Sequence, residues 1–141
     1  YKETYRDQNH VTRASDGVSR SASTAIYYLL RAGERSTWHR IRSDEMWHFY
    51  DGAPLRIHVL EPGGGYRMLR LGHPLRHEGA HFQALVPAGC WFAAECEEPD
   101  GYGLAGCTVA PGFEFDEFEI GDAGFLERHW PEQRELIARL A

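Results

Sequence analysis

Lysine is almost absent from this chain, and neither charge nor apolar character is concentrated in one stretch. Lys2 is the only lysine, the arginines are spread along the sequence and the formal net charge is −6. A nucleic-acid surface needs clustered Lys and Arg, so the composition argues against a nucleic-acid partner. No segment approaches the roughly 20 consecutive apolar residues that a helix needs to cross a bilayer, so we expect no membrane partner.

Cysteine is scarce as well. Cys90, Cys96 and Cys107 are an odd number of cysteines without metal-type spacing. This argues against a disulfide framework and favours a reducing compartment, so we expect a cytoplasmic protein. No apolar segment at the start resembles a signal peptide. Because the sequence opens at Tyr1 in a strand-like polar stretch, we expect a preceding segment to be missing.

Aromatic residues, by contrast, make up 13% of the 141 residues, enough to fill a barrel interior or line a pocket. Short stretches rich in β-branched and aromatic residues alternate with Gly and Pro turns. These stretches predict strands at 24–30, 46–50, 55–60, 66–71, 82–86, 90–96 and 104–109. Such spacing predicts an all-β sandwich or barrel rather than a βαβ fold.

The end of the chain alone has a helical pattern. Pro131 suits a first helical position, and Leu136, Ile137 and Leu140 form one apolar stripe. The alternating Phe113–Asp116 is predicted to be a half-exposed edge strand. The length is typical of one domain, and no repeat or linker divides the chain, so we expect a single domain over residues 1–141.

The most specific pattern lies in GERSTWHRIRSDEMWHFYDG, residues 33–52. Its spacing, G-x5-His39-x-Ile41-x3-Glu45-x6-G, is similar to the first cupin motif, G-x5-H-x-H-x3-E-x6-G, with Ile41 in place of the second His. Residues two apart in a strand share a face, so His39 and Ile41 are predicted to point together into a barrel. Glu45, Trp47 and Phe49 share one face of the next strand. His48 lies on the other face unless a β-bulge reverses it, and the sequence leaves both arrangements open.

A carboxylate and an imidazole among aromatic side chains are desolvated, so we expect perturbed pKa values for His39 and Glu45. Such a pair suits proton transfer, with Glu45 orienting or charging the His39 ring. The alternative is that the two residues form a buried structural pair without a catalytic role.

The second cupin motif has a partial counterpart in PAGCWF, residues 87–92. Phe92 stands at the position of its His and Cys96 at that of its Asn. Zinc, iron and manganese sites generally need three or more protein ligands, so no tightly held metal is expected. A divalent transition metal would need His48, Gln83 or Cys96 beside His39 and Glu45.

Several strings spread over nearly the whole chain resemble the cupin superfamily 5 group (DUF985). They are YKETYRD (1–7), STAIYYLL (23–30), WHRIRSDEMWHFYDG (38–52), QALVPAGCWFAAE (83–95) and GCTVAPGFEFDEFE (106–119). The resemblance implies a double-stranded β-helix, or jelly roll, that forms a homodimer. It also implies a small-molecule pocket near the residues that match His39, Glu45, His48, Gln83, Trp91 and Phe92. The chain departs from the family in lacking its Pro- and Gly-rich lead-in and in a His-rich segment at 72–81.

Three functions are consistent with the sequence. The first is a metal-independent enzyme of the isomerase or epimerase type that acts on a small polar molecule, with His39, Glu45 and His48 as catalytic candidates. Its predicted substrate-binding residues are Tyr28, Trp47, Phe49, Gln83, Trp91 and Phe92. The second is a metal-dependent cupin, an oxygenase or isomerase, in which His39, Glu45 and His48 must converge on one point. The third is a non-catalytic protein whose aromatic pocket captures a small ligand.

Overall fold

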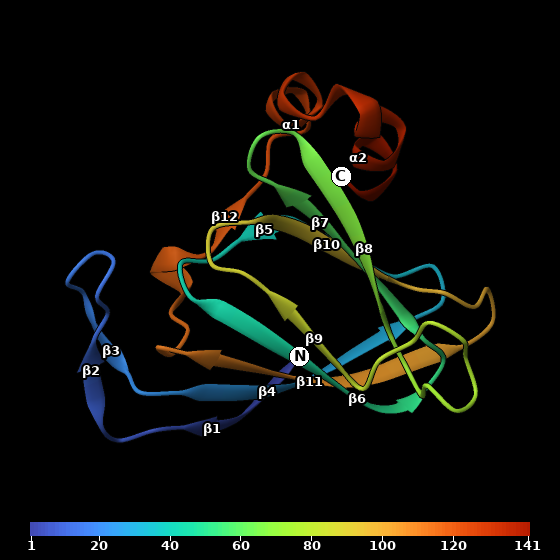
Figure 1. Cartoon of the computed structure of the whole chain (residues 1–141). Coiled ribbons are helices and arrows are strands. Elements are labelled where there is room, and N and C mark those ends of the chain that lie inside the picture. Colours follow the sequence, from blue (N-terminus) through green and yellow to red (C-terminus); the bar gives the residue numbers. More distant parts are fainter.

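Apolar and polar residues alternate along the strands. Two antiparallel sheets therefore pack face to face and bury their apolar sides against each other. The computed structural model describes residues 1–141, and Figure 1 shows the two layers with a helical segment against one of them. Consecutive strands from β4 (Thr24–Arg31) to β7 (Leu55–Glu61) alternate between the sheets. This is the connectivity of a jelly roll, so the predicted all-β cupin fold is confirmed.

The first sheet has the strand order β1-β4-β11-β6-β9 and the second has the order β12-β5-β10-β7-β8. In the first sheet the other strands are β1 (Lys2–Arg6), β11 (Tyr102–Ala110), β6 (Asp44–Gly52) and β9 (Gln83–Val86). In the second they are β12 (Glu119–Ile120), β5 (Arg35–Arg40), β10 (Trp91–Cys96) and β8 (Gly65–Leu71). A hairpin of β2 (His10–Thr12) and β3 (Ser19–Ser21) extends from one end of the molecule (Figure 1). All seven predicted strands are therefore present.

The space between the sheets holds the main apolar core. Leu55, Ile57 and Val59 alternate along β7 and are fully buried, as are Phe92 of β10 and Leu71 of β8. Each such side chain contributes about 1.5–3 kcal/mol when it leaves water. Every second side chain of these strands points inward, and the burial of these side chains holds the two sheets together.

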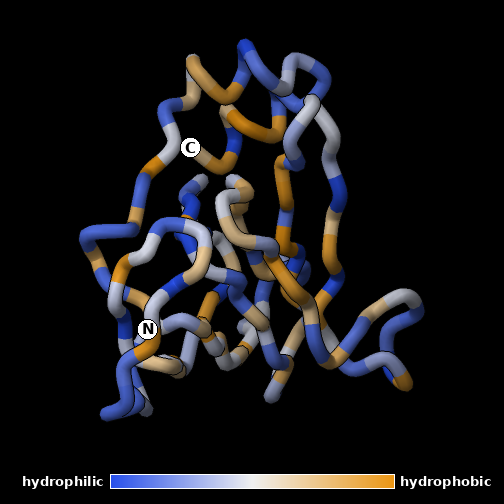
Figure 2. The backbone as a smooth tube through the Cα atoms, turned by 60° about the vertical axis from the view of Figure 1, so that its left-hand side comes forward, coloured by the Kyte–Doolittle hydropathy of each residue, from blue (hydrophilic) through white to orange (hydrophobic).

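A second core lies outside the second sheet, under the C-terminal helices. Leu126 of α1 (Ala123–His129) and Ile137 and Leu140 of α2 (Arg134–Leu140) pack on Trp38 and Trp91. In Figure 2 the tube of these helices changes between orange and blue, as expected for helices with one apolar face. Both helices are too short and too polar to span a bilayer.

The helical end differs from its sequence prediction in two ways. Pro131 begins a 3₁₀ turn, η2 (Pro131–Gln133), and the α-helix starts only at Arg134. A helix that was not predicted, α1, precedes it; the Asp122 carboxylate caps it by accepting a hydrogen bond from the Phe125 N–H at 2.7 Å. The apolar stripe of α2 was predicted correctly, with Ile137 and Leu140 buried.

The predicted edge strand at Phe113–Asp116 is wrong. This segment leads into a 3₁₀ turn, η1 (Phe115–Glu117), and pairs with no strand. Its two charges pair with arginines of other elements: Glu114 with Arg6 of β1 and Asp116 with Arg20 of β3.

A polar chain joins α2 to the second sheet. The His58 ring lies between the Tyr66 hydroxyl, 2.8 Å from Nδ1, and the Glu95 carboxylate, 3.0 Å from Nε2. Arg139 of α2 donates to both oxygens of Glu95. The hydrogen bonds from Arg139 and then from His58 lower the pKa of Glu95 to about 2 from its ordinary 4.5.

Replacing Arg139 with alanine should reduce the free energy of unfolding at pH 7 by about 1–2 kcal/mol, a discounted value because Arg139 is half exposed. Since the folded-state pKa of Glu95 is depressed, its stabilisation is present above about pH 4.5 and is lost as the pH falls toward 2. The difference between wild type and Arg139→Ala should therefore shrink over that interval. Urea unfolding at several pH values measures this stability difference.

Arg134→Ala, at an exposed arginine at the start of the same helix, is the matched control. An equal loss of stability in Arg134→Ala would contradict the conclusion that Arg139 stabilises the fold through Glu95.

Candidate functional site

One end of the barrel is hollow. A cavity of about 570 Å³ lies between the sheets and is lined by nineteen residues, ten of them hydrophobic. Its walls come from β1, β4, β11 and β6 of the first sheet, from β5 of the second and from the segment 113–118. A cavity of this size, mostly apolar with a few polar groups, is typical of small-molecule sites.

His39 reaches the cavity from β5 with one ring nitrogen committed. Its Nδ1 lies 2.7 Å from the Thr37 carbonyl oxygen, which can only accept, so Nδ1 carries the proton. Burial lowers the pKa of His39 below its ordinary 6.5, and the ring is therefore neutral at pH 7. No protein group is hydrogen-bonded to Nε2, which remains a free basic nitrogen.

Glu45 enters the same cavity from β6 of the opposite sheet. Burial raises its pKa from 4.5 to about 7, and a hydrogen bond with the Cys107 thiol opposes this only weakly. No arginine or lysine is paired with it. The carboxyl group is therefore substantially protonated near neutral pH and can donate a hydrogen bond or a proton.

The expected contact between these two residues is absent. Glu45 is not hydrogen-bonded to His39, whose Nδ1 is bound by Thr37 instead. The prediction that Glu45 orients or charges the His39 ring is therefore wrong, because the turn into β6 leaves the two groups on separate walls. They face one cavity as independent groups.

Aromatic side chains surround both groups. The ring centroids of Phe92 and His39 are 4.1 Å apart, and the Phe118 ring stacks on the imidazole with a centroid distance of 5.0 Å. Trp47 and Tyr28 pack edge to face at 5.3 Å beside Glu45. The indole N–H of Trp47 is buried and has no hydrogen-bond partner.

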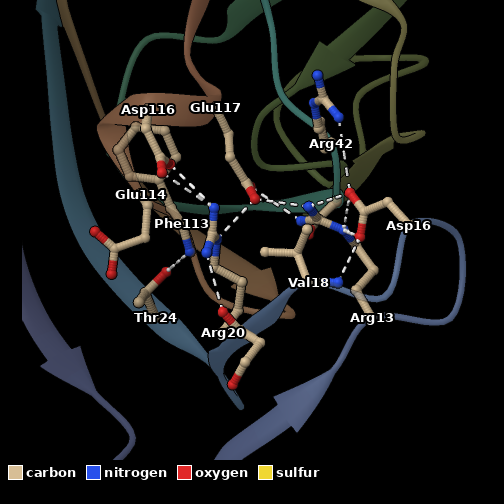
Figure 3. Close-up of polar contacts among 12 residues, drawn as sticks. Arg13, Asp16, Val18, Arg20, Thr24, Arg42, Phe113, Glu114, Asp116 and Glu117 are labelled. Atoms are coloured by element: carbon tan, nitrogen blue, oxygen red, sulfur yellow. Dashed lines mark hydrogen bonds and ion pairs between the residues drawn. The ribbon is translucent and has the colours of Figure 1, made fainter.

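A network of buried charges fixes the outer wall of the cavity. Arg13 of the hairpin, 5% exposed, donates to both oxygens of Glu117, and Arg20 donates to one of them at 2.7 Å. Figure 3 shows the Glu117 carboxylate between these guanidinium groups. Asp16 receives further bonds from Arg13. Because Glu117 immediately precedes Phe118, the network holds the ring that stacks on His39.

The rim is closed by a second set of ion pairs. Arg6 of β1 donates to Glu3 and Glu114, each at 2.7 Å, and to the Phe113 carbonyl oxygen at 3.1 Å. The Arg35 guanidinium donates to the backbone oxygen of Ala141 at 2.7 Å. Both arginines that line the cavity are therefore already partnered.

Not all predicted site residues meet here. Tyr28, His39, Glu45 and Trp47 line the cavity. His48 does not: it lies on the outer face of β6, where Nε2 is 2.9 Å from the Thr108 hydroxyl. The bulge that would have turned it inward is displaced along the strand, since the register of β6 with β11 shifts at Tyr50.

The remaining predicted residues also lie elsewhere. Gln83 is exposed on the outer face of the first sheet, its amide nitrogen 3.5 Å from Nδ1 of His48. Trp91 packs under the helices, with the Arg40 guanidinium 4.4 Å from its ring centroid. Phe49 and Phe92 face inward but belong to the core beneath the cavity.

The donor set does not fit a metal ion of the usual cupin kind. No three His, Cys, Asp or Glu side chains are grouped so as to hold one. His39 and Glu45 would need a third ligand, and His48 points away from both. The convergence of His39, Glu45 and His48 that the metal-dependent alternative requires is therefore not met. Ile41 lies at the cavity wall in the position where the motif has its second His.

Sequence reasoning missed the rim. The cavity residues that were not predicted include Tyr1, Glu3, Arg6, Phe113, Glu114, Phe115 and Phe118. The concentration of phenylalanine in 113–118 was a visible signal, but it was interpreted as an edge strand.

The chain is similar to proteins whose activity is not described. The family model Cupin superfamily (DUF985) matches residues 1–121. A hypothetical protein from Leishmania major has a TM-score of 0.89 at 31% identity, covering 99% of this chain and 87% of that one. A protein from Shewanella oneidensis has a TM-score of 0.87 at 36% identity, covering 99% and 84%. A cupin 2 domain-containing protein from Halorhodospira halophila shares the fold alone, with a TM-score of 0.61 and 13% identity over 94% and 80%. No curated protein matches the chain.

Replacing Glu45 with glutamine should stabilise the ligand-free protein at alkaline pH. The pKa of Glu45 is raised by burial, so its contribution is fully present below about pH 4.5 and is lost as the pH rises through about 7. At pH 8 the variant should exceed wild type by about 2–3 kcal/mol, with little difference at pH 4.5. Denaturant unfolding across this range measures the gap. Glu98→Gln, on the exposed surface, should show no such trend, and a pH-independent gap at Glu45 would contradict the burial argument.

Proposed function

Because this chain belongs to the DUF985 family of the cupin superfamily and its barrel presents an imidazole and a carboxyl group to one cavity, we propose that it binds a small molecule there and transfers a proton on it. The reaction would be an isomerisation or epimerisation. His39 is the base, acting through Nε2, and Glu45 is the acid on the opposite wall.

One observation carries this proposal: burial reverses the usual order of the two pKa values, so that the carboxyl group of Glu45 has a higher pKa than the imidazole of His39. The pKa of His39 falls from 6.5 and that of Glu45 rises to about 7. A neutral imidazole and a protonated carboxyl group therefore coexist near neutral pH. A base and an acid that are ready at the same pH are what general acid–base catalysis requires.

The surroundings support the same chemistry. The hydrogen bond from Nδ1 to Thr37 fixes the tautomer, and the rings of Phe92 and Phe118 both pack against the imidazole. Apolar walls exclude water, which strengthens electrostatic interactions with a bound molecule. The cupin barrel hosts many reactions, so the proposal depends on these side chains and not on the fold.

A ligand screen in D₂O tests the proposal, with ligand-observed NMR reporting both binding and replacement of carbon-bound hydrogen by deuterium. A ligand that binds wild type should exchange a C–H hydrogen, and His39→Gln should slow that exchange by about 10²–10⁴-fold. His48→Gln is the matched control, because His48 lies outside the barrel on the next strand. Its exchange rate should equal that of wild type. Ligands that bind without any exchange would make this a non-catalytic binding protein.

A further inference from the structure

Two polar groups that line the cavity lack a strong partner. The Glu45 carboxyl group has only the Cys107 thiol, and Nε2 of His39 has no donor. Both residues are more than nine-tenths buried. Buried polar groups in proteins are usually hydrogen-bonded, and a bound ligand is one way of satisfying these two.

We propose that the cavity takes an apolar carbonyl compound, whose oxygen accepts a hydrogen bond from the Glu45 carboxyl group. This inference rests on the proposed function and names its substrate class. His39 would then face a carbon next to the carbonyl group.

Glu45 faces the cavity from β6, and no arginine or lysine is paired with its carboxyl group. A protonated carboxyl group donates a hydrogen bond through its O–H. The ligand atom that takes this hydrogen bond must be an acceptor, which excludes an ammonium group at this point.

The rest of the ligand is expected to be apolar. The inner wall contributes Ile26, Ile41 and Val109, and the outer wall contributes Phe113 and Phe118. The charges at the rim give no free anchor for a phosphate or a carboxylate, because Arg6 is held by two glutamates and Arg35 by a backbone oxygen. A molecule with one carbonyl group on a hydrocarbon body matches this distribution.

The titratable and charged groups that line the cavity with Glu45 come from four strands, the start of the chain and the segment before η1. They are Cys107 of β11, Tyr28 of β4, His39 and Arg35 of β5, Glu3 and Arg6 of β1, Tyr1, and Glu114 before η1. Burial raises the pKa of Cys107 and of Tyr28, so both are neutral near pH 7. The rim charges pair with one another, which leaves Glu45 as the group whose protonation controls the donor.

The step is balanced without a co-reactant. Nε2 of His39 takes the proton from the carbon next to the carbonyl group, and the electron pair of that C–H bond becomes a C=C bond. The carbonyl π pair moves to oxygen, which takes the proton of Glu45. The enol forms, and its return by the reverse steps restores both protein groups and leaves the carbon with a proton from the His39 ring.

Three probes of nearly equal shape test the ligand class by calorimetry on wild-type protein at pH 5.5, 7.0 and 8.5. They are acetophenone, α-methylstyrene, in which CH₂ replaces the oxygen, and 1-phenylethylammonium, which carries a cation. Acetophenone should bind more tightly than α-methylstyrene at pH 5.5, and its affinity should fall by about 10- to 30-fold by pH 8.5 as Glu45 ionises. The affinity for α-methylstyrene should not change.

One variant tests the donor. Glu45→Gln keeps an N–H donor that does not titrate, so acetophenone binding should persist at pH 8.5. His48→Gln is the control, and its acetophenone affinity should fall between pH 5.5 and 8.5 as that of wild type does.

The outcomes are distinct. Acetophenone that binds no better than α-methylstyrene, or a cation that binds most tightly and gains affinity as the pH rises, overturns the ligand class. Deuteration of the acetophenone methyl group in D₂O is followed separately by NMR. Binding with the predicted pH dependence but without His39-dependent deuteration upholds the ligand class and overturns the proton-transfer function.

Discussion

The alternation of side chains along β6 determines which of its residues face the cavity. The strand is paired on both edges, with β11 on one side and β9 on the other, so its register cannot slip without breaking two ladders. Glu45 and Trp47 therefore both point between the sheets. His48 points to the outer face for the same reason. The bulge at Tyr50 lies beyond these residues and leaves their orientation unchanged.

Once Glu45 faces inward, the low polarity of the barrel determines its chemistry. An isolated carboxylate is costly to bury, so the group responds by retaining its proton. A neighbouring polar residue would reduce this effect, yet the nearby positions hold Ile41 and Phe92. The same two residues remove two positions at which a cupin would bind a metal. The apolar replacements therefore have two linked consequences. They leave fewer metal ligands, and they increase the pKa shifts of Glu45 and His39.

The outer wall depends on charges that lie far apart in the sequence. Arg13 and Arg20 belong to the β2–β3 hairpin, whereas Glu117 lies almost a hundred residues later. Burial opposes ionisation of Glu117, but bonds from both arginines keep its pKa below the ordinary value. Breaking such a buried pair leaves an uncompensated charge, so these ion pairs stabilise the contact between the hairpin and η1. Because Phe118 follows Glu117 and stacks on His39, these long-range ion pairs also help to position the His39 ring.

The sequence by itself indicated seven of the strands, an all-β sandwich or barrel and the shared cavity wall of His39 and Ile41, because strand alternation and turn chemistry are local properties. The jelly-roll class came from the motifs that resemble the cupin family. It also indicated that Glu45 would be perturbed, since a carboxyl group among aromatic residues is desolvated wherever the sheets meet. Only the tertiary structure decided that His48 faces outward, that Thr37 and not Glu45 holds the His39 ring, and that residues 113–118 form a wall. These outcomes depend on strand register and on contacts between segments far apart in the chain. No local pattern encodes such contacts.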